Sequence, residues 1–192
     1  ALTMWGIAGE FSEILRWSQT VVDLADGDPA MGAGFGFGSP LAAALAWRGA
    51  ARWWLGRPRW RQDHHDAVAM ARNSDPTTLA CVVAWTYGLE IQFGVLRADD
   101  AAVRVSEEAV QAAGSSTWVA LGLAECTLGA ALLSRDAAAD RDRGLELMVQ
   151  FGEVVRERAP FMVPVAELFV ARERAGRGDR DAAIAVMRQA VD

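Results

Sequence analysis

The sequence of 192 residues predicts an all-α protein in which antiparallel helix hairpins stack into a right-handed α-solenoid. Three observations carry this prediction. Alternating strand patterns are nearly absent, and alanine, leucine, arginine and glutamate, which favour helices, dominate the chain. Helix start and stop signals recur along its length. A small residue also returns at intervals of about forty residues, which is typical of stacked hairpins.

Several of the predicted helices have a recognisable start. Ser39-Pro40 and Asp75-Pro76 each place a capping side chain before a proline at the first helical position. Glycines lie near the ends of others. The only long break covers residues 26–38. We expect helices over roughly 11–25, 40–55, 60–73, 77–96, 99–113, 116–134, 139–158, 163–176 and 180–191.

The repeat is marked by a small residue in the middle of every second helix. These residues are Gly49, Gly88, Gly129 and Ala171, at spacings of 39, 41 and 42 residues. Small residues at such positions suit close approach of two helices. The chain has no initiator methionine and opens on apolar residues, so we expect it to be a piece of a longer protein. We predict one domain over residues 1–192, with hairpins over roughly 1–25, 40–73, 77–113, 116–158 and 163–192.

The stretch "GDRDAAIAVMRQAVD" has the spacing of the second helix of a tetratricopeptide repeat. Gly178 is followed at five residues by the small Ala183, then by the large Met187 and the small Ala190. On this pattern the last unit resembles a tetratricopeptide repeat. The spacings exceed the usual repeat of about thirty-four residues, so the units are expected to be elongated.

Four longer stretches carry a more specific resemblance. They are "GDPAMGAGFGFGSPLAAALAWRGAARWWLGRPRWRQD", "VLRADDAA", "LLSRDAAADRDRGLELM" and "VARERAGRGDRDAAIAVMRQAVD". Over nearly its whole length, the sequence resembles the C-terminal helical region of large actinobacterial signalling proteins. In those proteins a class III adenylyl/guanylyl cyclase domain is followed by an ATPase module and then by tetratricopeptide-like repeats. Some relatives end in a LuxR-type DNA-binding domain.

The resemblance implies a non-catalytic segment for regulation and protein–protein interaction in signal transduction. Its partners would be another protein or other domains of the parent chain, which is expected to be a nucleotide cyclase with an ATPase module. No cyclase or ATPase motif lies in this sequence, so no catalytic residue can be carried over. Two alternatives stay open: a small-molecule sensor with a ligand in the concave groove, and the repeat region of a LuxR-type transcriptional regulator.

Composition excludes several classes of function. The net charge is −6, which disfavours nucleic acid and anionic membranes as partners. All 19 basic residues are arginine, and a phosphate-binding P-loop needs a lysine. The longest uncharged run, residues 29–47, contains glycines and prolines and is no membrane span. Cys81 and Cys126 lie in apolar stretches and no signal peptide is visible, so we expect free thiols and a cytoplasmic location.

Residues 47–66, "WRGAARWWLGRPRWRQDHHD", hold four of the eight tryptophans. Trp47, Trp53 and Trp54 fall on two apolar faces of one helix, so we predict that they pack in the core rather than form a stacking platform. The turn that follows is different, because its arginines surround one tryptophan. It is the candidate corner for binding a partner or an anion, since arginine and tryptophan are frequent at interface hot spots. The corner consists of Arg57, Arg59, Trp60 and Arg61.

Two neighbouring sequence patterns are weaker indications of a binding site. Adjacent helical residues point about 100° apart, so His64 and His65 are not expected to share a metal ion. His64 falls where the repeat needs an inward residue. The run "GAGFGFGSP" precedes a helix, where an anion could bind, but no frame of it reads GxGxxG and no strand precedes it. No set of residues suggests catalysis, so we predict no catalytic site, no cofactor and no metal.

The final predicted helix carries an apolar stripe of Ile184, Met187 and Val191, with Ala183 and Ala190 beside it. No later helix in the sequence covers the stripe. Exposing such side chains forfeits on the order of 1.5–3 kcal/mol each. We therefore expect this helix either to mediate self-association of the chain or to fray.

Overall fold

A computed structural model describes residues 6, 8–34, 38–114 and 116–189, and all regular structure in these ranges is helical. The predicted all-α class is confirmed, and most predicted boundaries hold to within two residues. The helices are α2 (Phe11–Ala25), α3 (Pro40–Trp54), α4 (Trp60–Ala71), α5 (Pro76–Val83), α6 (Leu89–Gln92), α7 (Asp100–Ala113), α8 (Trp118–Leu133), α9 (Ala138–Arg158), α10 (Val163–Gly176) and α11 (Arg180–Gln189).

The helix expected over 77–96 is built differently. Residues Ala84–Gly88 form a π-helical turn between α5 and α6, and the last α-helical residue is Gln92. The hydroxyl of Thr86 donates to the carbonyl oxygen of Val82, 2.8 Å away. The prediction of one uniform helix was therefore wrong in its middle and at its end, since a π turn has no signal in hydrophobic periodicity.

The predicted helix starts are confirmed by hydrogen bonds. The hydroxyl of Ser39 accepts the N–H of Ala42, and the carboxylate of Asp75 accepts the N–H of Thr78. The same arrangement recurs at Asp99 for α7 and at Thr117 for α8. Each cap satisfies one of the backbone N–H groups that an α-helix leaves without a partner in its first turn.

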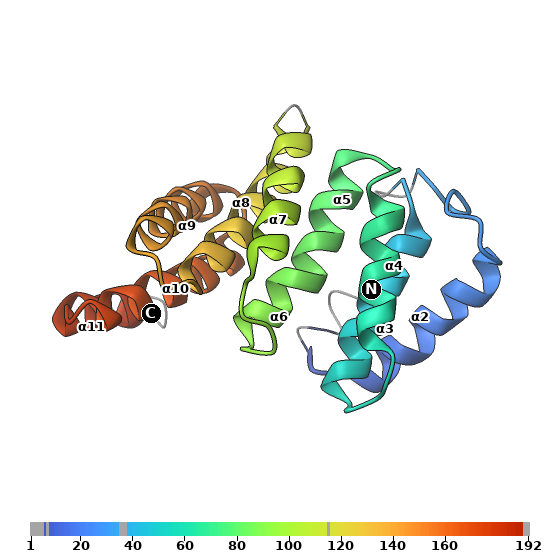
Figure 1. Cartoon of the computed structure of the whole chain (residues 1–192), viewed down its shortest axis with the longest axis horizontal. Coiled ribbons are helices and arrows are strands. Elements are labelled where there is room, and N and C mark those ends of the chain that lie inside the picture. Colours follow the sequence, from blue (N-terminus) through green and yellow to red (C-terminus); the bar gives the residue numbers. More distant parts are fainter. Residues whose placement is uncertain (1–5, 7, 35–37, 115, 190–192) are drawn as a thin grey trace.

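Consecutive helices pack on one another along the molecule. Figure 1 shows an elongated array, with α2 at one end of the long axis and α11 at the other. Neighbours in sequence are neighbours in space from α2 to α4 and from α7 to α11, and α5 contacts both α3 and α8. Alanine fills much of the core, so helix axes can approach closely. Fully buried examples are Ala42, Ala46, Ala67, Ala80, Ala109, Ala120 and Ala124.

Three of the four recurrent small residues, the glycines, lie at close contacts with a neighbouring helix. A Cβ on Gly49 would fall 2.1 Å from the His64 ring, and one on Gly88 would fall 3.1 Å from the Thr127 hydroxyl. A Cβ on Gly129 would meet Met148 at 3.2 Å. The fourth position, Ala171, is buried in α10.

The apolar stripe on α11 is only partly covered. Ala183 is buried, whereas Ile184 and Met187 are 51% and 40% exposed. Two further members of the stripe, Ala190 and Val191, lie outside the described residues. Among the helices that the structure describes, none has the length and apolar character needed to cross a membrane.

Candidate functional site

The turn between α3 and α4 is held in place by a buried ionic cluster beneath it. Asp63, in the first turn of α4, is 3% exposed. Its carboxylate accepts hydrogen bonds from Arg48 at 2.7 and 3.2 Å and from Arg52 at 2.6 Å. Arg48 also donates to the side-chain oxygen of Gln19 on α2. Two guanidinium groups share one carboxylate, so the cluster carries net positive charge directly below the turn.

His64 ties α4 to two further elements. Its Nδ1 lies 2.5 Å from Glu90 Oε1 on α6, and its Nε2 lies 3.1 Å from the carbonyl oxygen of Ala46 on α3. Both ring nitrogens thus face oxygen atoms, one from a side chain and one from the backbone. The absence of a side chain at Gly49 leaves room for the ring. The prediction that His64 points inward is confirmed.

The turn has a constrained backbone. Gly56 and Arg59 have φ values of +65° and +69°, in the left-handed region. Glycine adopts this conformation freely, whereas for arginine it costs about 1–2 kcal/mol. The N–H of Arg57 donates to the carbonyl oxygen of Arg52, 2.6 Å away. A strained residue at a ligand-accessible turn is a common feature of functional sites.

The structure brings the four residues of the predicted corner together. Arg57, Arg59 and Arg61 are exposed and Trp60 is half-buried. The Arg61 guanidinium lies over the Trp60 ring, 4.1 Å from its centroid, and the His64 ring meets its edge. In the part of the chain that the structure describes, none of these three arginines forms an ion pair. All four residues line a cavity of about 490 Å³, together with Trp53, Gly56 and Pro58.

Trp53 lines the same cavity. Its indole Nε1 is buried and has no hydrogen-bond partner among the described residues, so this N–H does not reach the cavity surface. The donors that the cavity presents are therefore the three guanidinium groups. Such a set of donors is complementary to carboxylate or other anionic oxygens.

Exposed aromatic side chains extend the site away from the arginines. Trp54 stacks on Phe11 with a centroid distance of 4.5 Å and meets Phe93 edge-on at 4.9 Å. Trp54 is 43% exposed and Phe93 is 52% exposed. The Trp53 ring contacts the rings of Trp54 and Phe93. We call the corner and these rings the Trp–Arg site, which consists of Phe11, Trp53, Trp54, Arg57, Arg59, Trp60, Arg61 and Phe93.

The core prediction for the tryptophans was only partly right. Trp47 is buried and packs 5.3 Å from the ring of Trp85. Trp54, by contrast, is the last residue of α3 and is covered on only part of its surface, by Phe11 and Phe93, so it stays exposed. Sequence reasoning also missed Phe93: the helix was expected to continue to residue 96, whereas α6 ends at Gln92 and Phe93 follows it. One feature of the sequence does point to the ionic cluster around Asp63. Arg48 and Arg52 lie four residues apart on an otherwise apolar helix.

At the helix start that follows the glycine run, the backbone N–H of Gly38 already has hydrogen-bond acceptors within the protein. The N–H of Gly38 donates to the Asp75 carboxylate at 2.6 Å and to the Thr78 hydroxyl oxygen at 2.9 Å. Residues 35–37 of the run lie outside the described residues. A carboxylate already sits at this helix start and would repel an anion. Partial burial acts to raise the pKa of Asp75, but hydrogen bonds from Thr78 and Gly38 outweigh it and hold that pKa below its ordinary value.

The histidines and cysteines that the sequence also offers do not come together in a common site. His64 is buried while His65 is exposed on another face of α4, so the two rings face different surroundings. In the described ranges no group of three or more metal-ligating side chains is close enough to hold an ion. Cys81 and Cys126 are free thiols, and burial raises the pKa of each to about 12. Neither is poised as a nucleophile in this environment.

Comparison with known proteins identifies no relative. No family model, no curated protein and no solved structure matches the chain.

Proposed function

We propose that the chain is a non-catalytic interaction segment that binds an acidic stretch of a partner protein, or of another domain of its parent protein, through the Trp–Arg site. The observation that carries the proposal is the cavity at the α3–α4 turn. It gathers around a half-buried tryptophan three exposed arginines that form no ion pair with any described residue. Most other arginines of the described chain are neutralised by nearby acids, for example Arg72 by Glu108 and Arg143 by Glu107.

The exposed rings beside the arginines favour a protein partner. Trp54 and Phe93 offer apolar area for a leucine or aromatic side chain next to the cationic cavity. Aromatic residues and arginine are enriched at protein interfaces and dominate their hot spots. A nucleic acid needs a longer basic track, and the chain as a whole carries a net charge of −6. A short acidic segment fits three guanidinium groups.

The wider role in the proposal rests on the resemblance of the sequence. Packing of consecutive helices supports a tetratricopeptide-like repeat scaffold, and the resemblance supports a place beside nucleotide-cyclase and ATPase domains. A partner bound at the Trp–Arg site would alter an attached ATPase switch only if its contacts differ between the two states of that switch.

The test uses a fluorescently labelled poly-L-glutamate peptide of about fifteen residues and fluorescence anisotropy at low salt. We expect saturable binding that weakens as salt screens the arginines. Changing Arg57, Arg59 and Arg61 to alanine should reduce affinity at least tenfold. The matched control changes Arg104, Arg174 and Arg180 to alanine, which removes the same charge elsewhere and should reduce affinity less than threefold.

A second variant separates binding from stability. Arg59→Gly removes one guanidinium and also relieves the left-handed strain, so it should stabilise the fold by about 1 kcal/mol while weakening peptide binding. Equal loss of affinity in the site variant and in the control variant would show that only net charge matters. Tighter binding of a duplex DNA of equal charge than of poly-glutamate would also contradict the proposal.

A further inference from the structure

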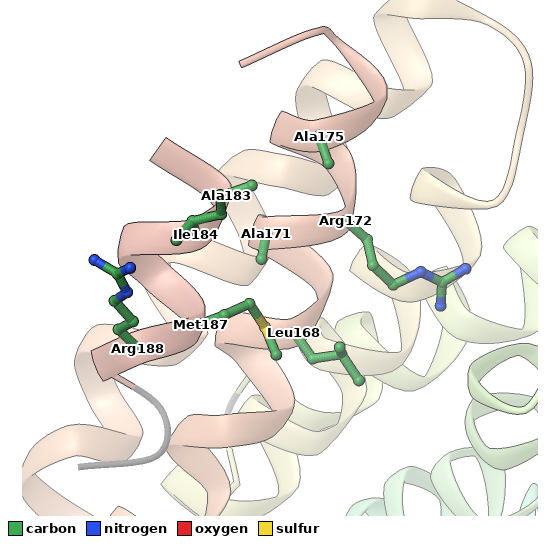
Figure 2. A pocket seen from close by; sticks show the side chains of 8 residues that line it. All are labelled: Leu168, Ala171, Arg172, Ala175, Ala183, Ile184, Met187 and Arg188. Carbon is green, nitrogen blue, oxygen red and sulfur yellow. The ribbon is translucent and has the colours of Figure 1, made fainter. Parts of the chain in front are cut away.

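A second surface lies at the other end of the molecule, between α10 and α11. The two helices enclose an open groove of about 740 Å³ with an apolar floor. Figure 2 shows Ile184 and Met187 from α11 and Leu168 from α10 lying between two arginine side chains. We call this surface the α11 groove, which is lined by Leu168, Ala171, Arg172, Ala175, Ala183, Ile184, Met187 and Arg188.

Two arginines at the margins of the α11 groove have no acidic partner among the described residues. Arg172 and Arg188 are exposed, and neither forms an ion pair within the residues that the structure describes. Other arginines of the same region do: Arg141 pairs with Glu173, and Arg177 pairs with Asp142. An occupant of the groove must therefore bring apolar side chains for its floor and carboxylates for its margins.

The opposite end of the array has this chemistry. Leu24 lies in the last turn of α2 and is 70% exposed. This is the largest exposed fraction among the large aliphatic side chains of the described residues. Asp23, Asp26 and Asp28 surround it in sequence and are exposed. None of the three takes part in an ion pair in the described ranges. We call Asp23, Leu24, Asp26 and Asp28 the acidic end of α2. It lies far from α11 along the long axis (Figure 1).

We propose that the α11 groove binds the acidic end of α2 from a second copy of this chain. Leu24 would lie on Ile184 and Met187, with the aspartates near Arg172 and Arg188. A symmetric contact between two α11 grooves is disfavoured because it would bring the four arginines together. The association is therefore head-to-tail: in a dimer one copy keeps a free groove and the other copy keeps a free acidic end, so further copies can add. It uses neither Arg57 nor any other member of the Trp–Arg site, so it is independent of the proposed function.

The test is sedimentation velocity on the 192-residue chain from about 5 to 200 μM. The chain should associate with concentration, and 0.5 M NaCl should weaken association several-fold. One variant carries Leu24→Asp and the other carries Ile184→Asp with Met187→Asp. Each should be monomeric alone. Their equimolar mixture should form a 1:1 dimer and nothing larger, because it retains one intact groove and one intact acidic end.

A matched control replaces Val149 and Val154 on α9, which are each 41% exposed, with aspartate and should associate like the unchanged chain. Circular dichroism confirms that every variant is folded. A monomeric unchanged chain at all concentrations would overturn the proposal. So would failure of the mixture to form a dimer, persistence of association in the Leu24→Asp variant, or loss of association in the α9 control.

Discussion

The α3–α4 and α8–α9 pairs both bring two helices together at a glycine, yet different groups face the glycine in each. Gly49 of α3 faces the His64 ring, which is bonded to Glu90 and to the Ala46 carbonyl. Gly129 of α8 and Gly144 of α9 face each other's backbone, with a Cβ on Gly144 falling 2.9 Å from the Gly129 carbonyl oxygen. One contact is built around a polar side chain and the other is purely steric.

A glycine in the middle of a helix therefore occurs at two different kinds of helix–helix interface. At α3–α4 the missing side chain makes room for a buried polar group, so the fold there depends on hydrogen bonds and charge. At α8–α9 it lets two backbones touch, so only volume matters. The Trp–Arg site adjoins the polar contact, because the Trp60 ring meets the His64 ring edge-on at a centroid distance of 5.7 Å. Its geometry therefore depends on the network of Asp63 and His64.

The largest effect should come from removing the polar side chain itself. His64→Ala leaves Glu90 buried without a partner and should cost about 3–5 kcal/mol of unfolding free energy, measured by urea denaturation. Glu90→Gln is the matched control, because its amide can donate to Nδ1 while Nε2 donates to Ala46. It should cost less than about 1 kcal/mol. Equal costs for the two variants would show that the ring acts only by filling space.

The next effect tests whether Gly49 and His64 form one unit. Gly49→Ala would place its Cβ 2.1 Å from the ring and displace it, so we expect a loss of about 1–3 kcal/mol. In the His64→Ala background the ring is gone, and the same change should become neutral or stabilising because alanine favours helix by about 1 kcal/mol. A double-mutant cycle measures this coupling. Additive effects would contradict it.

The α8–α9 contact should respond to volume alone. Gly144→Ala forces backbone apart and should cost about 1–2 kcal/mol after its helix-propensity gain. Gly129→Ala meets Met148 at 3.2 Å and backbone oxygen at 3.3 Å, and the flexible methionine can move. We expect its net effect to lie within about 0.5 kcal/mol of zero. Denaturation midpoints would rank the two variants, and a reversed order would contradict a steric contact.

The last expected loss concerns Asp75, the N-cap residue of α5 that also binds the N–H of Gly38. Asp75→Ala removes the cap of α5 and one of the two acceptors of the Gly38 N–H, and should cost about 1 kcal/mol at pH 7. Since the folded-state pKa of Asp75 is lowered, its contribution is complete above the ordinary pKa of 3.8 and is lost as pH falls through the lower folded value. The difference between the two proteins should thus be constant from pH 7 to about pH 5 and should shrink below pH 3.8.

Asp75→Asn is the control for that prediction. Asparagine is as good a helix cap as aspartate and does not ionise in this range, so it should keep the α5 cap at pH 7. Its single side-chain oxygen cannot replace both carboxylate oxygens, so the hydrogen bond from Gly38 should be lost. Its stability should not show the acid-dependent loss. An unchanged difference between Asp75→Ala and the unchanged chain down to pH 2.5 would show that the carboxylate contributes nothing through its charge.

The helical class, the helix positions and the Trp–Arg corner followed from the sequence because they depend on neighbours in the chain. Capping at Ser39 and Asp75 acts over three residues, and the corner of Arg57, Arg59, Trp60 and Arg61 lies within one turn. The inward position of His64 followed from the repeat spacing. These features need only the helical period and local hydrogen bonds.

Contacts between distant residues were decided only by the tertiary structure. His64 meets Glu90 across 26 residues, and Trp54 meets Phe93 across 39. Whether Trp54 is buried depends on whether another helix covers the end of α3, which periodicity cannot show. The Asp63 carboxylate could serve as a helix-start acid or as an arginine partner, and packing of α3 on α4 selects the second. Burial and pairing are set by which helices meet, and no single helix carries that information in its own sequence.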